Sequence, residues 1–188
     1  MNVLTLLASP RMDGNTAAIL GWVEGALRES GHGVERVDLS KLTIGGCMSC
    51  FACAESPDEP GCVRMDDGQD VLKRMTEVDA VLFATPLYMW SYAAQLKPLI
   101  DRMVCLVRDG HTPTHRSFAE GTRAALLVSC MGPVDQNTEA VRFAFPNLAE
   151  YMLFDDRGVW VFPNCTEPKT LPNTHGSKAR ELAESLVA

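Results

Sequence analysis

Several features that would assign a protein to a familiar class are missing from this sequence. No apolar run approaches the roughly 20 residues needed to cross a lipid bilayer, so we expect no membrane segment. There is no basic excess: the 188 residues carry a formal net charge of −7, which argues against a nucleic acid or a membrane surface as partner. The chain opens directly into a strand pattern, without the basic region and cleavage site of a signal peptide, and we therefore expect a cytoplasmic protein.

Common ligand-binding motifs are missing as well. The loop at 9–16 has neither the Gly-Lys-Ser/Thr ending of a Walker motif nor the Gly-x-Gly-x-x-Gly spacing of dinucleotide sites. We find no internal repeat or low-complexity segment, and we expect a single domain over residues 1–188. The histidines show no spacing that would place them on one face as metal ligands: His32, His111, His115 and His175.

Short apolar segments alternate with helical patterns along the chain. Five segments read as strands, most of them apolar on both faces: 3–8, 34–39, 78–84, 124–128 and 158–162. Such alternation predicts a parallel sheet with helices on both faces. Five strands favour the flavodoxin-like α/β three-layer sandwich, with a five-stranded parallel sheet in the order 2-1-3-4-5.

Local features refine this prediction. The last two helices are expected near 137–152 and 177–187, and Pro146 predicts a kink or break in the first of them. We interpret Asp66 and Asp67 as the acidic first turn of the second helix rather than as a metal site. Residues 108–121 are polar and predict a long connection. Three basic residues are expected to form a solvated helix face: Lys97, Arg102 and Arg108.

The loop after the first strand has the composition of a phosphate site. It reads Ser-Pro-Arg-Met-Asp-Gly-Asn-Thr over 9–16 and leads directly into a helix. Ligands of doubly wound sheets bind at the carboxyl ends of the strands, where the strand order reverses, and the first strand lies beside that point. The free N–H groups of a helix N-terminus suit a phosphate monoester, and Arg11 can add charge. The alternative is a turn without ligand, capped by Asn15 or Thr16.

The loop after the third strand has a different composition. Residues 85–92 combine aromatic, methionine and small polar side chains at another strand end. A flat ring needs apolar faces and backbone donors at its polar edge, and Tyr88, Met89 and Trp90 can supply the faces. The alternative is that these side chains pack the following helix onto the sheet. A phosphate-type and a ring-type loop on adjacent strand ends together favour a bound nucleotide-like cofactor.

Four of the seven cysteines cluster as Cys-x2-Cys-x2-Cys-x8-Cys at Cys47, Cys50, Cys53 and Cys62. An odd number of cysteines would leave one outside a closed disulfide framework, and a tight cluster favours a metal or redox role. Four thiolates can hold a [4Fe–4S] cluster or a tetrahedral zinc ion. A third possibility is that the four cysteines are free thiols.

These motifs resemble those of the NAD(P)H-dependent FMN reductase and iron–sulfur flavoprotein branch of the flavodoxin-like superfamily. The resemblance lies in the 9–16 loop, the cysteine motif with the following acidic pair at 66–67, and Thr-Pro-Leu-Tyr at 85–88 running on to 95–97 and 101–102. It covers the first half of the chain well. The last gap of the cysteine motif is longer than expected for cluster-binding members, and the insert at 55–60 is acidic and rich in proline.

The resemblance implies FMN as cofactor and assigns its ligands. The phosphate would be held by Ser9, Arg11, Gly14, Asn15 and Thr16. The isoalloxazine would be surrounded by Pro86, Leu87, Tyr88, Met89, Trp90 and Ser91, with the turn at 129–132 nearby. A [4Fe–4S] cluster would be held by Cys47, Cys50, Cys53 and Cys62.

The implied activity is that of an oxidoreductase which passes electrons from NAD(P)H through FMN to a small acceptor such as a quinone or a free flavin. No protein acid or base is required, so no catalytic residue is assigned. One alternative is an iron–sulfur electron carrier that receives electrons from a ferredoxin. Another is a flavin-free binding module on the same fold. The resemblance also implies a homodimer or higher homo-oligomer.

Overall fold

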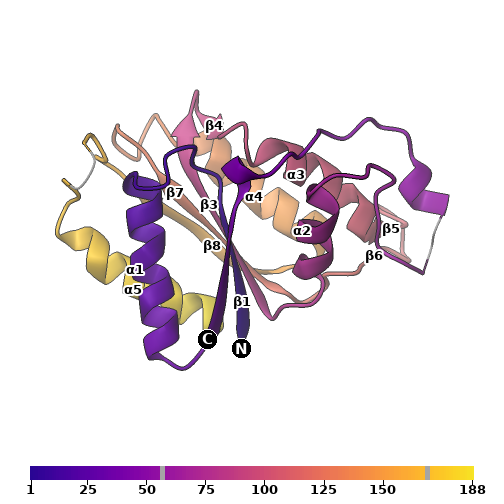
Figure 1. The fold of residues 1–188 in the computed structure, drawn as a ribbon, viewed down its shortest axis with the longest axis horizontal. Helices are drawn as coiled ribbons and strands as arrows, with labels where there is room; N and C mark the ends of the chain where they lie inside the picture. The colour runs from indigo at the N-terminus through magenta and orange to yellow at the C-terminus, as the bar shows by residue number, and fades with distance from the viewer. Residues whose placement is uncertain (56–57, 168–169) are drawn as a thin grey trace.

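A parallel sheet forms the centre of the computed structural model, which describes residues 1–55, 58–167 and 170–188 (Figure 1). Its strands are β1 (Asn2–Leu7), β2 (Gly33–Asp38), β3 (Ala80–Tyr88), β7 (Arg123–Ser129) and β8 (Asp155–Phe162). They follow the order β2-β1-β3-β7-β8, and all four pairings are parallel. The predicted flavodoxin-like order is therefore confirmed.

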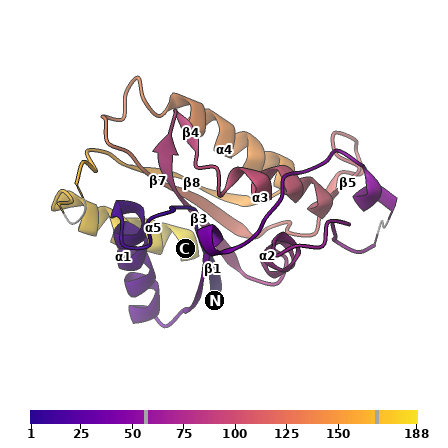
Figure 2. The same ribbon diagram turned by 45° about the horizontal axis from the view of Figure 1, so that its top comes forward.

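Helices cover both faces of this sheet (Figures 1 and 2). One face carries α1 (Asn15–Glu29) and α5 (Thr174–Val187), which pack side by side. The other carries α2 (Gly68–Met75), α3 (Lys97–Arg102) and α4 (Glu139–Met152). Short 3-10 helices lie at Leu39–Lys41, Ala52–Glu55 and Met103–Leu106.

The alternation of side chains along each strand divides the core into two layers. Leu4 and Leu6 of β1 belong to the layer under α2, α3 and α4, whereas Val3 and Leu7 belong to the layer under α1 and α5. This is the period of two that a strand imposes, and it explains why the central strands read as apolar on both faces. Phe83 of β3 lies in the first layer, where its ring packs against those of Phe145 and Phe154.

Three predicted strands and the last helix are longer than expected. The third strand continues through Tyr88 and turns into β4 (Ser91–Tyr92), which pairs with it in antiparallel fashion, so much of the predicted loop is strand. The fourth and fifth strands extend over Arg123–Ser129 and Asp155–Phe162. The last helix begins at Thr174 rather than 177. Hydrogen bonds rather than the apolar pattern define these ends.

The expected break at Pro146 is not observed, since α4 runs unbroken from Glu139 to Met152. Pro146 cannot donate to the carbonyl of Arg142, but both residues are exposed, so water can satisfy that carbonyl. Phe145 and Ala149 are buried on the opposite face and hold the helix against the sheet.

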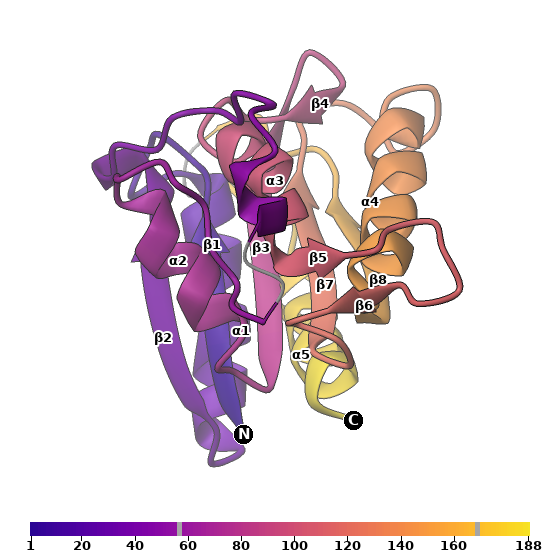
Figure 3. The same cartoon turned by 90° about the vertical axis from the view of Figure 1, so that its right-hand side faces the viewer.

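The polar connection at 108–121 also contains regular structure. Two short strands, β5 (Val107–Arg108) and β6 (Arg116–Ser117), form a separate hairpin beside α4 (Figure 3). His115 contacts the carbonyl of Tyr151 in α4 through Nε2 at 3.0 Å.

The expected solvated face is wrong for two of its three members, since Arg102 and Arg108 are 1% and 6% exposed. The acidic insert at 55–60 includes residues 56–57, which lie outside the described residues.

A buried polar network ties α1 to the edge of the sheet. Glu24 is 3% exposed and accepts hydrogen bonds from Thr5 Oγ1 at 2.6 Å and from Arg36 Nε and Nη2 at 2.8 and 2.7 Å. Arg28 lies 3.6 Å from the same carboxylate. Because a buried carboxylate without partners is costly, this pairing stabilises the β2 edge.

We expect R36M to lower the free energy of unfolding by roughly 2–3 kcal/mol, below the ~3–5 kcal/mol of a fully buried pair because Arg28 remains nearby. The double variant E24L/R36M should recover more than half of this loss. Urea unfolding followed by circular dichroism measures both. K73A is the control, because its ion pair with Glu77 is exposed and contributes under about 0.5 kcal/mol. Equal losses for R36M and K73A would contradict the role given to Glu24.

Candidate functional site

A cleft of about 230 Å³ opens at the carboxyl ends of the parallel strands. The loop after β1 contributes Ser9, Arg11, Gly14, Asn15 and Thr16, and β3 contributes Pro86, Leu87 and Tyr88. The structure thus brings together the two loops that the sequence analysis singled out. Three further residues of the predicted set do not line the cleft: Met89, Trp90 and Ser91.

The N-terminal turn of α1 faces this cleft without a side-chain cap. Gly14 occupies the N-cap position and no side chain bonds to the cap, so the predicted capping by Asn15 or Thr16 is wrong. The first N–H groups of the helix are therefore left for another acceptor. The buried Oδ1 of Asn15 also has no hydrogen-bond partner within the described part of the chain. Together these groups leave unused hydrogen-bonding capacity beside the cleft.

The rest of the loop is held in place by internal bonds. Ser9 Oγ accepts a hydrogen bond from the Arg11 amide and donates one to the Arg11 carbonyl, each at 3.1 Å. Thr16 Oγ1 lies 2.6 Å from Ser129 Oγ in a buried contact that joins the start of α1 to the end of β7. A Cβ at Gly14 would approach Arg11 Cβ to 3.1 Å, so a larger residue would displace this loop. The helix end and the strand end are thus fixed relative to each other.

The aromatic loop is a two-residue hairpin turn between β3 and β4. Met89 and Trp90 both have positive φ angles, 49° and 61°, which cost energy for residues other than glycine. Their side chains point outward, with 84% and 56% of their surface exposed. Thr85 anchors the base of this hairpin, because its Oγ1 accepts a hydrogen bond from the Ala93 amide at 3.0 Å. The turn therefore presents apolar side chains beside the cleft rather than within it.

The far wall of the cleft comes from residues after β7 and β8. Met131 and Thr166 line it with two cysteines, Cys130 and Cys165. The Cys165 amide donates to the Cys130 carbonyl at 2.9 Å, which continues the pairing of the two strands. Burial raises the pKa of both thiols, that of Cys165 to about 11, so both remain neutral at physiological pH. Sequence reasoning left Cys165 and Thr166 out, although their place after the fifth strand could have indicated them.

A second pocket, of about 110 Å³, collects the predicted cluster ligands. We call it the cysteine pocket: its lining includes Cys47, Cys50, Cys53, Cys62, Cys105 and Arg102. Cys47 and Cys50 are exposed, whereas Cys53 and Cys62 are half-buried. No three histidine, cysteine, aspartate or glutamate side chains of the described residues are gathered closely enough to hold a metal ion. The four thiols line one pocket and suit a thiolate-bound group in their chemistry, but they are not drawn together around one point, and their role as ligands stays a prediction.

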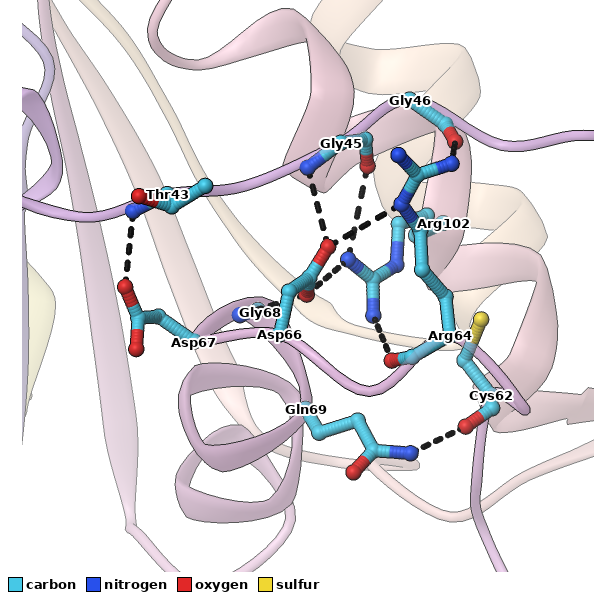
Figure 4. Close-up of polar contacts among 10 residues, drawn as sticks. All are labelled: Thr43, Gly45, Gly46, Cys62, Arg64, Asp66, Asp67, Gly68, Gln69 and Arg102. Carbon is cyan, nitrogen blue, oxygen red and sulfur yellow. Dashed lines mark hydrogen bonds and ion pairs between the residues drawn. The ribbon is translucent and has the colours of Figure 1, made fainter.

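The base of the cysteine pocket is closed by an ion pair between Asp66 and Arg102 (Figure 4). Asp66 also accepts hydrogen bonds from the amides of Gly45 and Gly68, both at 3.0 Å, and from Arg64 Nε at 3.1 Å. Burial tends to raise the pKa of Asp66, but these bonds, led by Arg102, outweigh it and hold the pKa below its ordinary value. Asp66 is therefore an ionised bridge between two parts of the chain.

The neighbouring residues strengthen this bridge (Figure 4). Asp67 Oδ2 accepts a hydrogen bond from the Thr43 amide at 2.7 Å, and Gln69 Nε2 donates to the Cys62 carbonyl. The acidic pair thus precedes α2, which begins at Gly68, and fastens the segments on both sides of the cysteines. Asp67 is the N-cap of α2 and Asp66 accepts a hydrogen bond from the Gly68 amide, so both residues lie at the helix start as expected, immediately before the first turn.

Comparisons with known proteins agree with this fold. The family model for NADPH-dependent FMN reductase matches residues 1–167. An iron–sulfur flavoprotein of Archaeoglobus fulgidus is 36% identical over 114 residues, which are 61% of this chain and 49% of that protein. The chain spans about half the length of the curated relatives it matches. Across the described residues, no helix combines the length and apolar character that crossing a membrane requires.

Solved structures show the same architecture at low sequence identity. An FMN-dependent NADH-azoreductase from Bacillus anthracis, in complex with FMN, has a TM-score of 0.71 at 13% identity and covers 100% of both chains. An NAD(P)H:quinone oxidoreductase from Methanothermobacter marburgensis has a TM-score of 0.68 at 18% identity, with 100% of this chain and 98% of that one covered. With the family match, this likeness shows that the chain belongs to the NADPH-dependent FMN reductase family and has a flavodoxin-like fold.

Proposed function

We propose that this chain binds FMN in the cleft at the strand ends and transfers electrons from NAD(P)H through it to a small acceptor. The observation that carries this proposal is the uncapped start of α1, which lines the cleft together with Arg11. Arg11 is the one charged side chain among the described residues that line the cleft, so no carboxylate there repels a phosphate. A phosphate monoester is the ligand that such a helix end favours.

The remaining residues of the site divide into two roles. Thr16 and Ser129 hold the helix end against the strand end, and this fixes where a phosphate would bind. Tyr88, Met89 and Trp90 offer apolar surface for the isoalloxazine ring. Bound FMN supplies the hydride and electron chemistry, and the protein binds, orients and shields it.

The donor and the acceptor must approach from the open side of the site. The exposed turn at Met89 and Trp90 leaves room for a nicotinamide to stack on one face of the ring. Burial raises the pKa of Cys165 to about 11, so this thiol of the cleft wall stays neutral beside the bound flavin. The proposed acceptors are quinones, free flavins or similar small molecules. A homodimer remains a prediction from the sequence resemblance.

Rapid anaerobic mixing tests the oxidoreductase function. FMN-loaded protein mixed with NADPH or NADH should lose the visible absorbance of its oxidised flavin, because hydride transfer reduces the ring. A flavin spectrum that persists with both nucleotides would contradict the proposed donor. Failure of the purified protein to bind FMN in equilibrium dialysis would instead favour a flavin-free binding module.

Removal of the loop cation tests the phosphate site directly. We expect R11A to weaken FMN binding about fivefold, which corresponds to ~1 kcal/mol, because an exposed charge contributes less than a buried one. Quenching of flavin fluorescence on binding measures the Kd. R28A is the matched control, since Arg28 lies in the last turn of the same helix and should leave the Kd unchanged. Equal effects of R11A and R28A would mean that only net charge matters.

An iron–sulfur electron carrier is the second candidate function. The observation that favours it is that all four cysteines of the motif line one pocket. Anaerobic reconstitution followed by iron and sulfide assays should find a [4Fe–4S] content that falls in C62S and persists in C165S. The absence of bound iron and sulfide in the reconstituted wild-type protein would remove this candidate and leave the FMN proposal intact.

A further inference from the structure

One buried cation lies against the cysteine pocket. Arg102 belongs to α3, its side chain is 0% exposed, and it lines the pocket together with the four cysteines of the motif. A buried arginine needs a partner for its charge and acceptors for its N–H groups. Its contacts therefore show which segments of the chain Arg102 joins.

The guanidinium joins the two segments that lead into and out of the cysteine motif (Figure 4). Nη1 pairs with Asp66 and lies 3.4 Å from the Gly45 carbonyl, while Nη2 donates to the Arg64 carbonyl at 3.2 Å. Gly45 precedes the first cysteine and Arg64 follows the last one. Arg102 thus fixes the distance between the two ends of the segment at 47–62.

The same side chain also lines the pocket beside sulfur. Cys62 and Cys105 line the pocket together with Arg102. The buried Nε of Arg102 has no hydrogen-bond partner among the described residues. The arginine therefore keeps an unused donor beside a pocket lined with sulfur atoms.

The charges around the pocket favour an anionic occupant. Asp66 balances one guanidinium, and Arg108 is a second buried cation, whose Nη2 donates to the carbonyl of Glu59 in the cysteine segment at 2.7 Å. Arg64 is partly exposed and shares Asp66. A metal group held by four thiolates carries negative charge, and each added electron increases it. A fixed buried cation stabilises the more negative state.

We propose that Arg102 is a positioning residue of the cysteine pocket, which holds both ends of the cysteine segment and places a positive charge in the pocket wall so that a bound iron–sulfur group is easier to reduce. This inference rests on the second candidate function. It concerns the potential of the group and not only its retention, because hydrogen bonds to cluster sulfur and nearby charge set that potential.

The test measures the midpoint potential of the reconstituted protein in an anaerobic dithionite titration, followed by the electron paramagnetic resonance signal of the reduced cluster. R102Q should shift the one-electron equilibrium at least tenfold toward the oxidised form, which is about 59 mV more negative. R102K keeps the charge and should stay near the wild-type potential, although it loses the two-armed contact with the backbone.

Two controls separate this effect on the potential from a loss of folding. R36Q removes the half-buried cation that pairs with Glu24 on the α1 side of the sheet, and should change neither the potential nor the iron content. Circular dichroism and FMN fluorescence show whether each variant is folded. If folded R102Q retains no iron whereas R102K does, the requirement for the charge is supported.

Other outcomes overturn the inference. Equal potentials for wild type, R102K and R102Q would show that the charge does not act on the group. Equal shifts, or equal loss of iron, in R102K and R102Q would assign a purely structural role to the arginine. Wild-type protein that binds FMN but never binds iron would remove the second candidate function, and this inference with it.

Discussion

The start of α1 is the feature on which the site depends. A helix that begins without a side-chain cap leaves several N–H groups unpaired, and in this fold the residues at the helix start line a cleft. The helix end is fixed by the contact between Thr16 and Ser129, and therefore by the register of β3 and β7. The position of the helix end thus depends both on this local polar contact and on the order of the strands in the sheet.

The chain separates two kinds of chemistry in space. The cleft at the strand ends contains one exposed cation and neutral groups, which suits a phosphate and a flat ring. The cysteine pocket lies under the segment that crosses the α2 and α3 face, and its lining shares no residue with the cleft within the described part of the chain. Asp66 and Arg102 fasten this segment to the fold, so a long irregular stretch is held at its base by a few buried bonds.

Much of this architecture was predictable from the sequence. The strand order followed from apolar segments separated by helical patterns, because a strand buried on both faces must be apolar throughout. The two loops that line the cleft were found because one has the residue types that bind a phosphate and the other has those that surround a flat ring. The sequence resemblance added the identity of the expected cofactor.

The errors have physical causes as well. Arg102 and Arg108 looked like surface residues because charge alone does not reveal a buried partner 36 positions away, as Asp66 is for Arg102. The continuation of β3 past Pro86 was missed because proline and threonine suggest a loop, yet Thr85 and the antiparallel β4 support this extension. Pro146 did not break α4, since its missing hydrogen bond faces solvent. Contacts with other parts of the chain decided the first two cases, and exposure to solvent decided the third.

The central claim is that the open helix end binds a phosphate group. The most direct measurement compares the Kd of FMN with that of riboflavin, which has the same ring and side chain but no phosphate, on the wild-type protein by equilibrium dialysis. The account predicts that FMN binds at least about tenfold more tightly, a difference of ~1.4 kcal/mol. Equal affinities for the two flavins would contradict it.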